Sequence, residues 1–120
     1  MAGHRTDRVS EDIRREIMAI VRELKDPRVQ DKLLTVARVE VSADASFAKV
    51  YISAMEGIEV AKTAVKALKN ATGYIRRQVG QNLHLRKTPE LKFVADDSIA
   101  HGMDIVRIMN ELHTDNDEEG

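Results

Sequence analysis

Apolar residues near the start of the chain recur with the period of an amphipathic helix, which predicts a helix over residues 10–24. Its apolar positions are Val9, Ile13, Ile17, Ile20, Val21 and Leu24. Thr6 or Ser10 is expected to cap this helix, because a hydroxyl can accept a hydrogen bond from a first-turn amide. Pro27 is expected to stop it, because proline cannot continue the ladder of backbone hydrogen bonds.

The next two segments have the composition and alternation of β-strands. Residues 34–42 are rich in β-branched side chains, and residues 48–54 alternate between an apolar face and a polar face. Residues 43–46 between them form a turn candidate. The two segments therefore predict an antiparallel hairpin.

Helical spacing returns over residues 58–71, and a second, separate apolar stripe follows at Ile75, Val79 and Leu83. The weak helix formers between the two stripes, Thr72 and Gly73, predict a kink at residues 71–73.

The last part of the chain predicts a short strand over residues 91–95 and a final helix over residues 105–112. Asp96, Asp97 and Ser98 stand before that helix, where they are expected to cap it rather than to act in catalysis. The order of elements predicts an α+β fold in which helices cover one face of a three-stranded sheet. Residues 1–112 form the predicted domain, and residues 113–120 form an acidic tail that is too polar to fold alone.

The 120 residues suffice for one domain, and 42% hydrophobic with 32% charged residues is typical of a soluble globular protein. Cysteine is absent, which excludes disulfides and thiolate metal sites. The start of the chain lacks the apolar core of a signal peptide, so a cytoplasmic location is expected. We expect no membrane association and no cofactor.

Charge is distributed unevenly along the chain. Between Val60 and Lys92 there are eight basic residues and one acid, Glu90, which leaves +7 in 33 residues. Such a cluster is a footprint for a polyanion. The alternative is a solvated helix face.

The basic residues on either side of the predicted kink are the candidate RNA-binding residues. They are Lys62, Lys66, Lys69, Arg76, Arg77, Arg86 and Lys87. Gly73 would let a phosphate backbone approach closely, or would serve helix–helix packing, and both readings stay open. If this surface is not used, the RNA contact moves to Arg5, Arg8 and Arg28. Aromatic residues are few and scattered, which argues against a base-stacking sheet.

Signals for an enzyme are weak. The sequence has no phosphate-binding loop, and its four histidines have no partner at metal-ligand spacing. We therefore predict no catalytic residues and no metal site. A protein–protein adaptor that uses the basic face against an acidic partner is the alternative to an RNA-binding protein.

Six segments, in this order and at this spacing, make the chain similar to the bacterial ribosome-binding factor A family over about residues 5–112. They are RTDRV (5–9), KDPRV (25–29), VEVS (39–42), AKVYIS (48–53), ATGYIR (71–76) and PELKF (89–93). The resemblance implies a KH-like domain of type II, with the order αββααβ. In that family an Ala-x-Gly kink, matched by Ala71, Thr72 and Gly73, replaces the usual Gly-x-x-Gly loop.

The resemblance also implies a function. The family members are non-enzymatic factors that bind free small (30S) ribosomal subunits and assist their late maturation and the processing of 16S rRNA, notably in the cold. The implied rRNA neighbourhood is the 5′-terminal helix region, and release is linked to a ribosome-dependent GTPase. By this resemblance the protein is expected to be a monomer.

Overall fold

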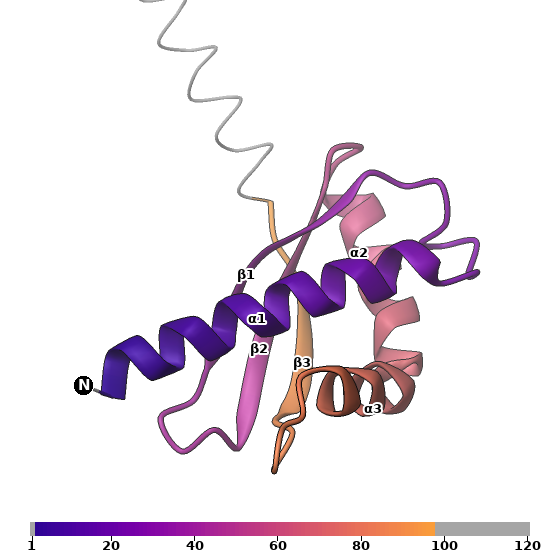
Figure 1. The fold of residues 1–120 in the computed structure, drawn as a ribbon. Coiled ribbons are helices and arrows are strands. Elements are labelled where there is room, and N and C mark those ends of the chain that lie inside the picture. Colours follow the sequence, from indigo (N-terminus) through magenta and orange to yellow (C-terminus); the bar gives the residue numbers. More distant parts are fainter. Residues whose placement is uncertain (1, 98–120) are drawn as a thin grey trace, which may run out of the picture.

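The structure is a computed structural model that describes the backbone of residues 2–97 and the side chains of residues 8–97. The predicted helix at residues 105–112 and the predicted tail at 113–120 lie outside the described residues. Within them the elements follow the predicted order αββααβ (Figure 1). Their bounds are α1 (Ala2–Glu23), β1 (Leu34–Val41), β2 (Phe47–Ala54), α2 (Ile58–Asn70), α3 (Thr72–Asn82) and β3 (Glu90–Ala95).

The three strands form one mixed sheet in the order β1-β2-β3. β1 and β2 are antiparallel, as the hairpin prediction requires, and the register is shifted between Val36 and Arg38. β3 runs parallel to β2, with Phe93 opposite Val50. The long α2–α3 segment makes this parallel pairing possible, because a parallel strand needs a crossover connection.

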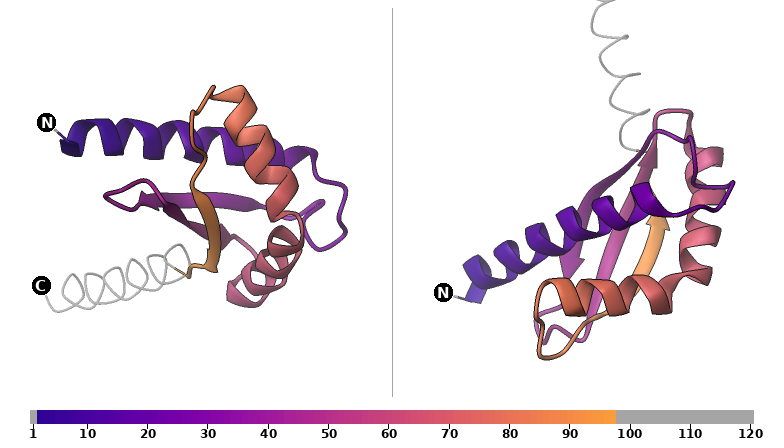
Figure 2. Two further views of the ribbon diagram at one scale, coloured as in Figure 1. Left: turned by 90° about the horizontal axis from the view of Figure 1, so that it is seen from below. Right: turned by 45° about the vertical axis from the view of Figure 1, so that its right-hand side comes forward.

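The helices pack on one face of the sheet, which confirms the predicted layer arrangement (Figure 2). Side chains of β2 alternate accordingly, so that Val50 and Ile52 are buried while Lys49 is exposed. Ile13 and Ile17 of α1 have no exposed surface and contribute to the same core. Burial of such side chains drives α1 onto the sheet, at about 1.5–3 kcal/mol for each large aliphatic side chain.

The first helix begins earlier than predicted. It starts at Ala2, so neither Thr6 nor Ser10 caps it. The apolar pattern missed this extension because residues 2–8 include only one apolar residue, Ala2, yet the backbone can still form helical hydrogen bonds. The end at Glu23, before Pro27, is close to the predicted one.

The break between the second and third helices is confirmed and lies at Ala71, the first residue of the predicted 71–73 kink. Ala71 has φ −97° and ψ 8°, outside the helical range, while Gly73 belongs to the first turn of α3. The two helices consequently run in different directions and meet at a corner (Figures 1 and 2). Among residues 2–97, no helix is long and apolar enough to span a bilayer.

Candidate nucleic-acid interface

The corner between α2 and α3 is held by the Thr72 side chain. Its hydroxyl donates to the carbonyl oxygens of Leu68 and Lys69, at 3.1 and 2.8 Å. These carbonyls lie in the last turn of α2, where intrahelical partners run out. Thr72, the first residue of α3, therefore caps the end of α2.

Gly73 faces open space beside this corner. A Cβ added to Gly73 would meet no atom within 4 Å, and the residue is exposed. The interpretation that Gly73 serves helix–helix packing is therefore wrong. An open backbone at a helix start instead permits close approach by a ligand, because first-turn N–H groups point outward.

A shallow hollow of about 300 Å³ lies next to Gly73. It is lined by Gly73, Arg76, Arg77 and Thr88. The hollow thus combines an accessible helix N-terminus with two guanidinium-bearing residues, which is a chemistry suited to phosphate.

Arg76, one of the predicted RNA-binding residues, already has hydrogen-bond partners within the protein. Its guanidinium donates to the carbonyl oxygens of Thr88, with Nη2 at 2.7 Å, and of Pro89, with Nε at 3.2 Å. One turn further along α3, a Cβ on Gly80 would lie only 2.4 Å from the Thr88 hydroxyl oxygen. Arg76 and Gly80 together dock the segment that enters β3 against α3.

The remaining predicted cations are exposed on α2, α3 and the loop that follows α3. Lys62 pairs with Glu59 at 3.6 Å, a surface contact that contributes little. Among residues 8–97, no ion pair is recorded for the other five, which are Lys66, Lys69, Arg77, Arg86 and Lys87. These five are available to an external anion.

In the alternative set of cations, Arg28 already has a partner within the protein. The side chain of Arg5 lies outside the described residues, and Arg8 is exposed on α1. Arg28 is engaged by Asp26 through two hydrogen bonds, at 2.8 and 3.1 Å. The Arg28 hydrogen bond also lowers the pKa of Asp26 to about 2. This pair stabilises the turn after α1.

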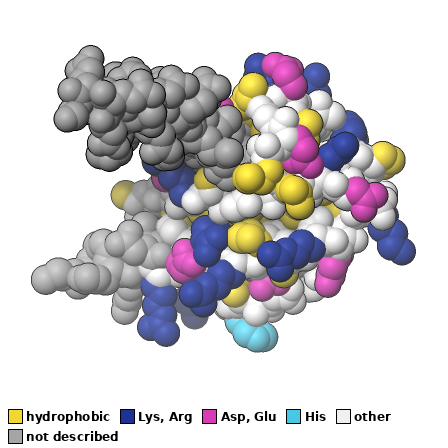
Figure 3. Space-filling model, turned by 90° about the horizontal axis from the view of Figure 1, so that it is seen from above, with side chains coloured by type: hydrophobic (Ala, Val, Ile, Leu, Met, Phe, Trp, Pro, Cys, Tyr) yellow, Lys and Arg dark blue, Asp and Glu magenta, His cyan; other side chains and the backbone are white. Residues whose placement is uncertain are grey.

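A further face of the molecule carries charges of both signs. Figure 3, which views the molecule from above relative to Figure 1, shows Lys and Arg side chains interspersed with Asp and Glu. On α1, for example, Glu11 forms ion pairs with Arg14 and Arg15. Of the eight cations in residues 60–92, seven lie on α2, α3 and the loop after α3, whereas Lys92 lies on β3.

The structure also adds residues that sequence reasoning missed. Tyr74 follows Gly73 and is 47% exposed at the start of α3. Of the other aromatic residues, Phe93 is buried in the core, whereas Phe47 and Tyr51 share the open face of the sheet. The sequence could have indicated this shared face, because Phe47 and Tyr51 are four positions apart in one strand and alternate residues of a strand lie on the same face of the sheet.

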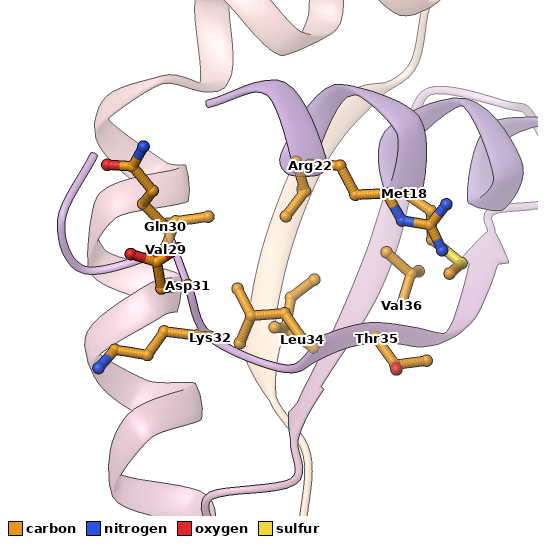
Figure 4. A pocket seen from close by; sticks show the side chains of 11 residues that line it. Met18, Arg22, Val29, Gln30, Asp31, Lys32, Leu34, Thr35 and Val36 are labelled. Carbon is orange, nitrogen blue, oxygen red and sulfur yellow. The ribbon is translucent and has the colours of Figure 1, made fainter. Parts of the chain in front are cut away.

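A second hollow of about 300 Å³ lies between the end of α1, the following loop and the start of β1 (Figure 4). Its floor is largely apolar, with Val29, Leu34 and Val36, and Arg22 and Lys32 lie at its rim. It carries no cluster of chemically reactive side chains.

The described part of the chain shows no arrangement typical of an active site. Among these residues, no group of three or more His, Asp or Glu side chains could hold a metal ion. The shifted carboxyl pKa values have structural causes and are lowered. Hydrogen bonds from Arg14 lower the pKa of Glu11 to about 2, those from Ser46 and Ser42 lower that of Asp44 to about 2, and the Leu33 amide lowers that of Glu56. General acid chemistry requires the opposite shift.

The family "Ribosome-binding factor A" matches residues 5–109. The chain belongs to this family. A ribosome-binding factor A from Caldicellulosiruptor bescii is 42% identical over 121 residues, covering 99% of this chain and 92% of that protein.

Solved structures agree with the family and the fold. A solution structure of a Thermotoga maritima putative ribosome-binding factor A is 33% identical, with a TM-score of 0.67, and covers 75% of this chain and 85% of that one. A homology model of Thermus thermophilus ribosome-binding factor A, fitted into the cryo-EM map of its 30S complex, is 30% identical with a TM-score of 0.53. It covers 73% of this chain and 87% of that one. The predicted KH-like order αββααβ is consistent with these neighbours.

Proposed function

We propose that this protein is a ribosome-binding factor that binds the free 30S subunit through the corner between α2 and α3. The observation that carries the proposal is the set of exposed cations on α2, α3 and the following loop that are unpaired among residues 8–97, together with the exposed Gly73 at the start of α3. We define the α2–α3 surface as Lys62, Lys66, Lys69, Gly73, Arg77, Arg86 and Lys87. A relative in the same family was fitted into a 30S complex, which supports the choice of partner.

The expected contact is with the backbone of 16S rRNA. Lysine and arginine neutralise phosphates without reading bases, and Gly73 leaves room for the sugar–phosphate chain beside α3. Tyr74, exposed next to Gly73, offers a ring for an unpaired base. Shape and backbone recognition therefore account for the binding better than base-specific readout.

In this proposal the protein is a non-enzymatic and monomeric assembly factor. It assists late maturation of the small subunit and the processing of 16S rRNA near the 5′-terminal helix region, with greatest importance in the cold. Release by a ribosome-dependent GTPase belongs to the same proposal. The resemblance to the family supports these finer points.

The experiment is co-sedimentation of the full chain with purified 30S subunits across a salt series. The variant pair Lys66→Glu, Arg77→Glu should weaken binding at least 10-fold. It should also flatten the salt dependence, since each phosphate contact contributes a log–log slope of roughly −0.7 to −0.9. The pair Lys25→Glu, Lys32→Glu is the control, because both residues are exposed and lie in the loop after α1.

Equal binding by both variant pairs and the unaltered protein would overturn the proposed surface. Binding that survives ribonuclease treatment of the partner and persists with an acidic protein would favour the adaptor function instead. Sedimentation with translating ribosomes rather than free 30S subunits would contradict the role in assembly.

A further inference from the structure

The sheet face opposite the helices carries a second group of cations and aromatic rings. Among residues 8–97, the helices pack against the other face, and this one displays side chains from all three strands. We define the sheet-face cluster as Arg38, Phe47, Lys49, Tyr51 and Lys92. Register places Arg38 opposite Tyr51 and Lys49 opposite Lys92, so the five side chains are close neighbours.

Arg38 lies stacked on Tyr51. Its guanidinium carbon is 4.2 Å from the centre of the Tyr51 ring, and its side chain is 62% exposed. The ring is itself fixed, because the Tyr51 hydroxyl donates to the Glu40 carboxylate at 3.0 Å. Glu40 also lies 3.5 Å from the guanidinium. These contacts hold Arg38 in one orientation, with one side on the ring and the other toward solvent.

A second ring lies at the far end of the same strand. Phe47 is 40% exposed, and the Lys92 ammonium lies 4.7 Å from the centre of its ring. Phe47 and Tyr51 are four residues apart on β2, which corresponds to about 13 Å. The Arg38 guanidinium on Tyr51 and the Phe47 ring therefore form two separate stacking platforms for unpaired bases.

The chemistry of this face favours unpaired bases over other partners. Two carboxylates, Glu40 and Glu90, share the face with three cations, so the net charge of +1 is too small for recognition by charge alone. Exposed planar groups of Arg and Phe are what a nucleobase stacks on, and nearby ammonium groups can neutralise its phosphates. A duplex hides its base faces and cannot use these platforms.

We propose that the sheet-face cluster binds a short stretch of single-stranded RNA. One base stacks on the exposed side of Arg38 and another on Phe47, while Lys49 and Lys92 contact the intervening phosphates. This site is separate from the α2–α3 surface, and the inference stands whether or not that surface binds 30S subunits.

The test is fluorescence anisotropy of the full chain with a labelled 12-nucleotide oligouridine RNA. The double variant Arg38→Ala, Phe47→Ala should raise Kd at least 5-fold, because each lost stacking contact typically costs a factor of that size or more. Phe47→Leu, which keeps an apolar side chain but removes the ring, should raise Kd in the same direction. Arg15→Ala, an exposed arginine on α1, is the matched control and should leave Kd unchanged. A 12-base-pair RNA duplex should bind the double variant and the unaltered protein equally.

Cross-linking with 4-thiouridine in the same oligonucleotide locates the contact. Cross-links to tryptic peptides 39–49 and 50–62, which contain Phe47 and Tyr51, are expected. Unchanged Kd in both Phe47→Leu and the double variant, or cross-links confined to residues 70–89, would overturn the inference. Cross-links from this face to a ribosomal protein, with no oligouridine binding, would also overturn it in favour of a protein partner. The 30S co-sedimentation tests Lys66 and Arg77, whereas the oligouridine assay tests Arg38 and Phe47. Either proposal can therefore fail while the other holds.

Discussion

The Arg76 guanidinium donates hydrogen bonds to the carbonyl oxygens of Thr88 and Pro89, and so ties α3 to the segment that leads into β3. This segment follows the loop that carries Arg86 and Lys87, and it leads into the parallel pairing of β3 with β2, where the Glu90 amide donates to the Ser46 carbonyl oxygen. Arg76 is thus a positioning residue for two cations of the α2–α3 surface. Arg77, its neighbour in sequence, remains open to a ligand.

Substitution at these two arginines should separate stability from binding. Arg76→Gln should lower the free energy of unfolding by about 1 kcal/mol, because charge-assisted hydrogen bonds to two carbonyls are lost at an exposed site. Arg77→Gln should leave stability within about 0.5 kcal/mol and weaken 30S binding. Urea unfolding and co-sedimentation measure the two effects. An unchanged urea unfolding midpoint for Arg76→Gln would show that its hydrogen bonds to Thr88 and Pro89 do not stabilise the fold.

The two glycines of α3 should respond differently to alanine. Gly73→Ala should raise the free energy of unfolding by about 0.5–1 kcal/mol, because alanine favours the helix and its Cβ meets nothing. Gly80→Ala should raise the free energy of unfolding less than Gly73→Ala does, or lower it, because its Cβ would clash with the Thr88 hydroxyl. Thermal unfolding of both variants is the measurement.

A double-mutant cycle tests the cause of the Gly80 effect. Adding Thr88→Ala to Gly80→Ala removes the hydroxyl oxygen, so the combined effect should be more favourable than the sum of the two single effects. Strict additivity would mean that the close approach of Gly80 to Thr88 is unimportant for folding.

Acid should destabilise the protein below about pH 4. The pKa values of Glu11, Asp26 and Asp44 are lowered to about 2 by hydrogen bonds, from 4.5, 3.8 and 3.8. A carboxyl whose folded pKa is depressed stabilises the fold above its unfolded pKa, and this contribution disappears as pH falls toward the folded value. The melting temperature should therefore fall between pH 4 and pH 2. Asp44→Asn should make this fall shallower, whereas Asp12→Asn, at an exposed position on α1, should change it much less.

Removal of residues 113–120 should leave the folded domain intact. The segment contains no apolar residue and four acids, so its loss should change the free energy of unfolding by less than about 0.5 kcal/mol. RNA affinity should rise slightly, because the removed acids repel phosphates. Calorimetry and a 30S binding titration on the truncated chain check both statements. A large drop in melting temperature would show that residues 113–120 dock on the domain.

The hydrophobic pattern alone predicted the order of the elements, the β1–β2 hairpin and the packing of the helices on one face of the sheet. Periodicity reports which side chains are buried, and burial is the main determinant of those features, as Val50 and Ile52 on β2 illustrate. It failed at the start of α1, because residues 3–8 are polar or glycine and give no hydrophobic periodicity to detect. Sequence resemblance supplied the family, and local charge supplied the basic region over residues 60–92.

Only the tertiary structure decided what each residue of the site does. Arg76 and Arg77 are equivalent in sequence, but only Arg76 reaches backbone carbonyls twelve and thirteen residues away. Gly73 and Gly80 likewise look alike, yet one faces open space and the other a threonine hydroxyl. The sequence showed only scattered aromatic residues, whereas the register of β1 and β2 places the Tyr51 ring against Arg38. Such contacts join residues distant in sequence, and their distances are set by the packing of whole elements, which no local pattern encodes.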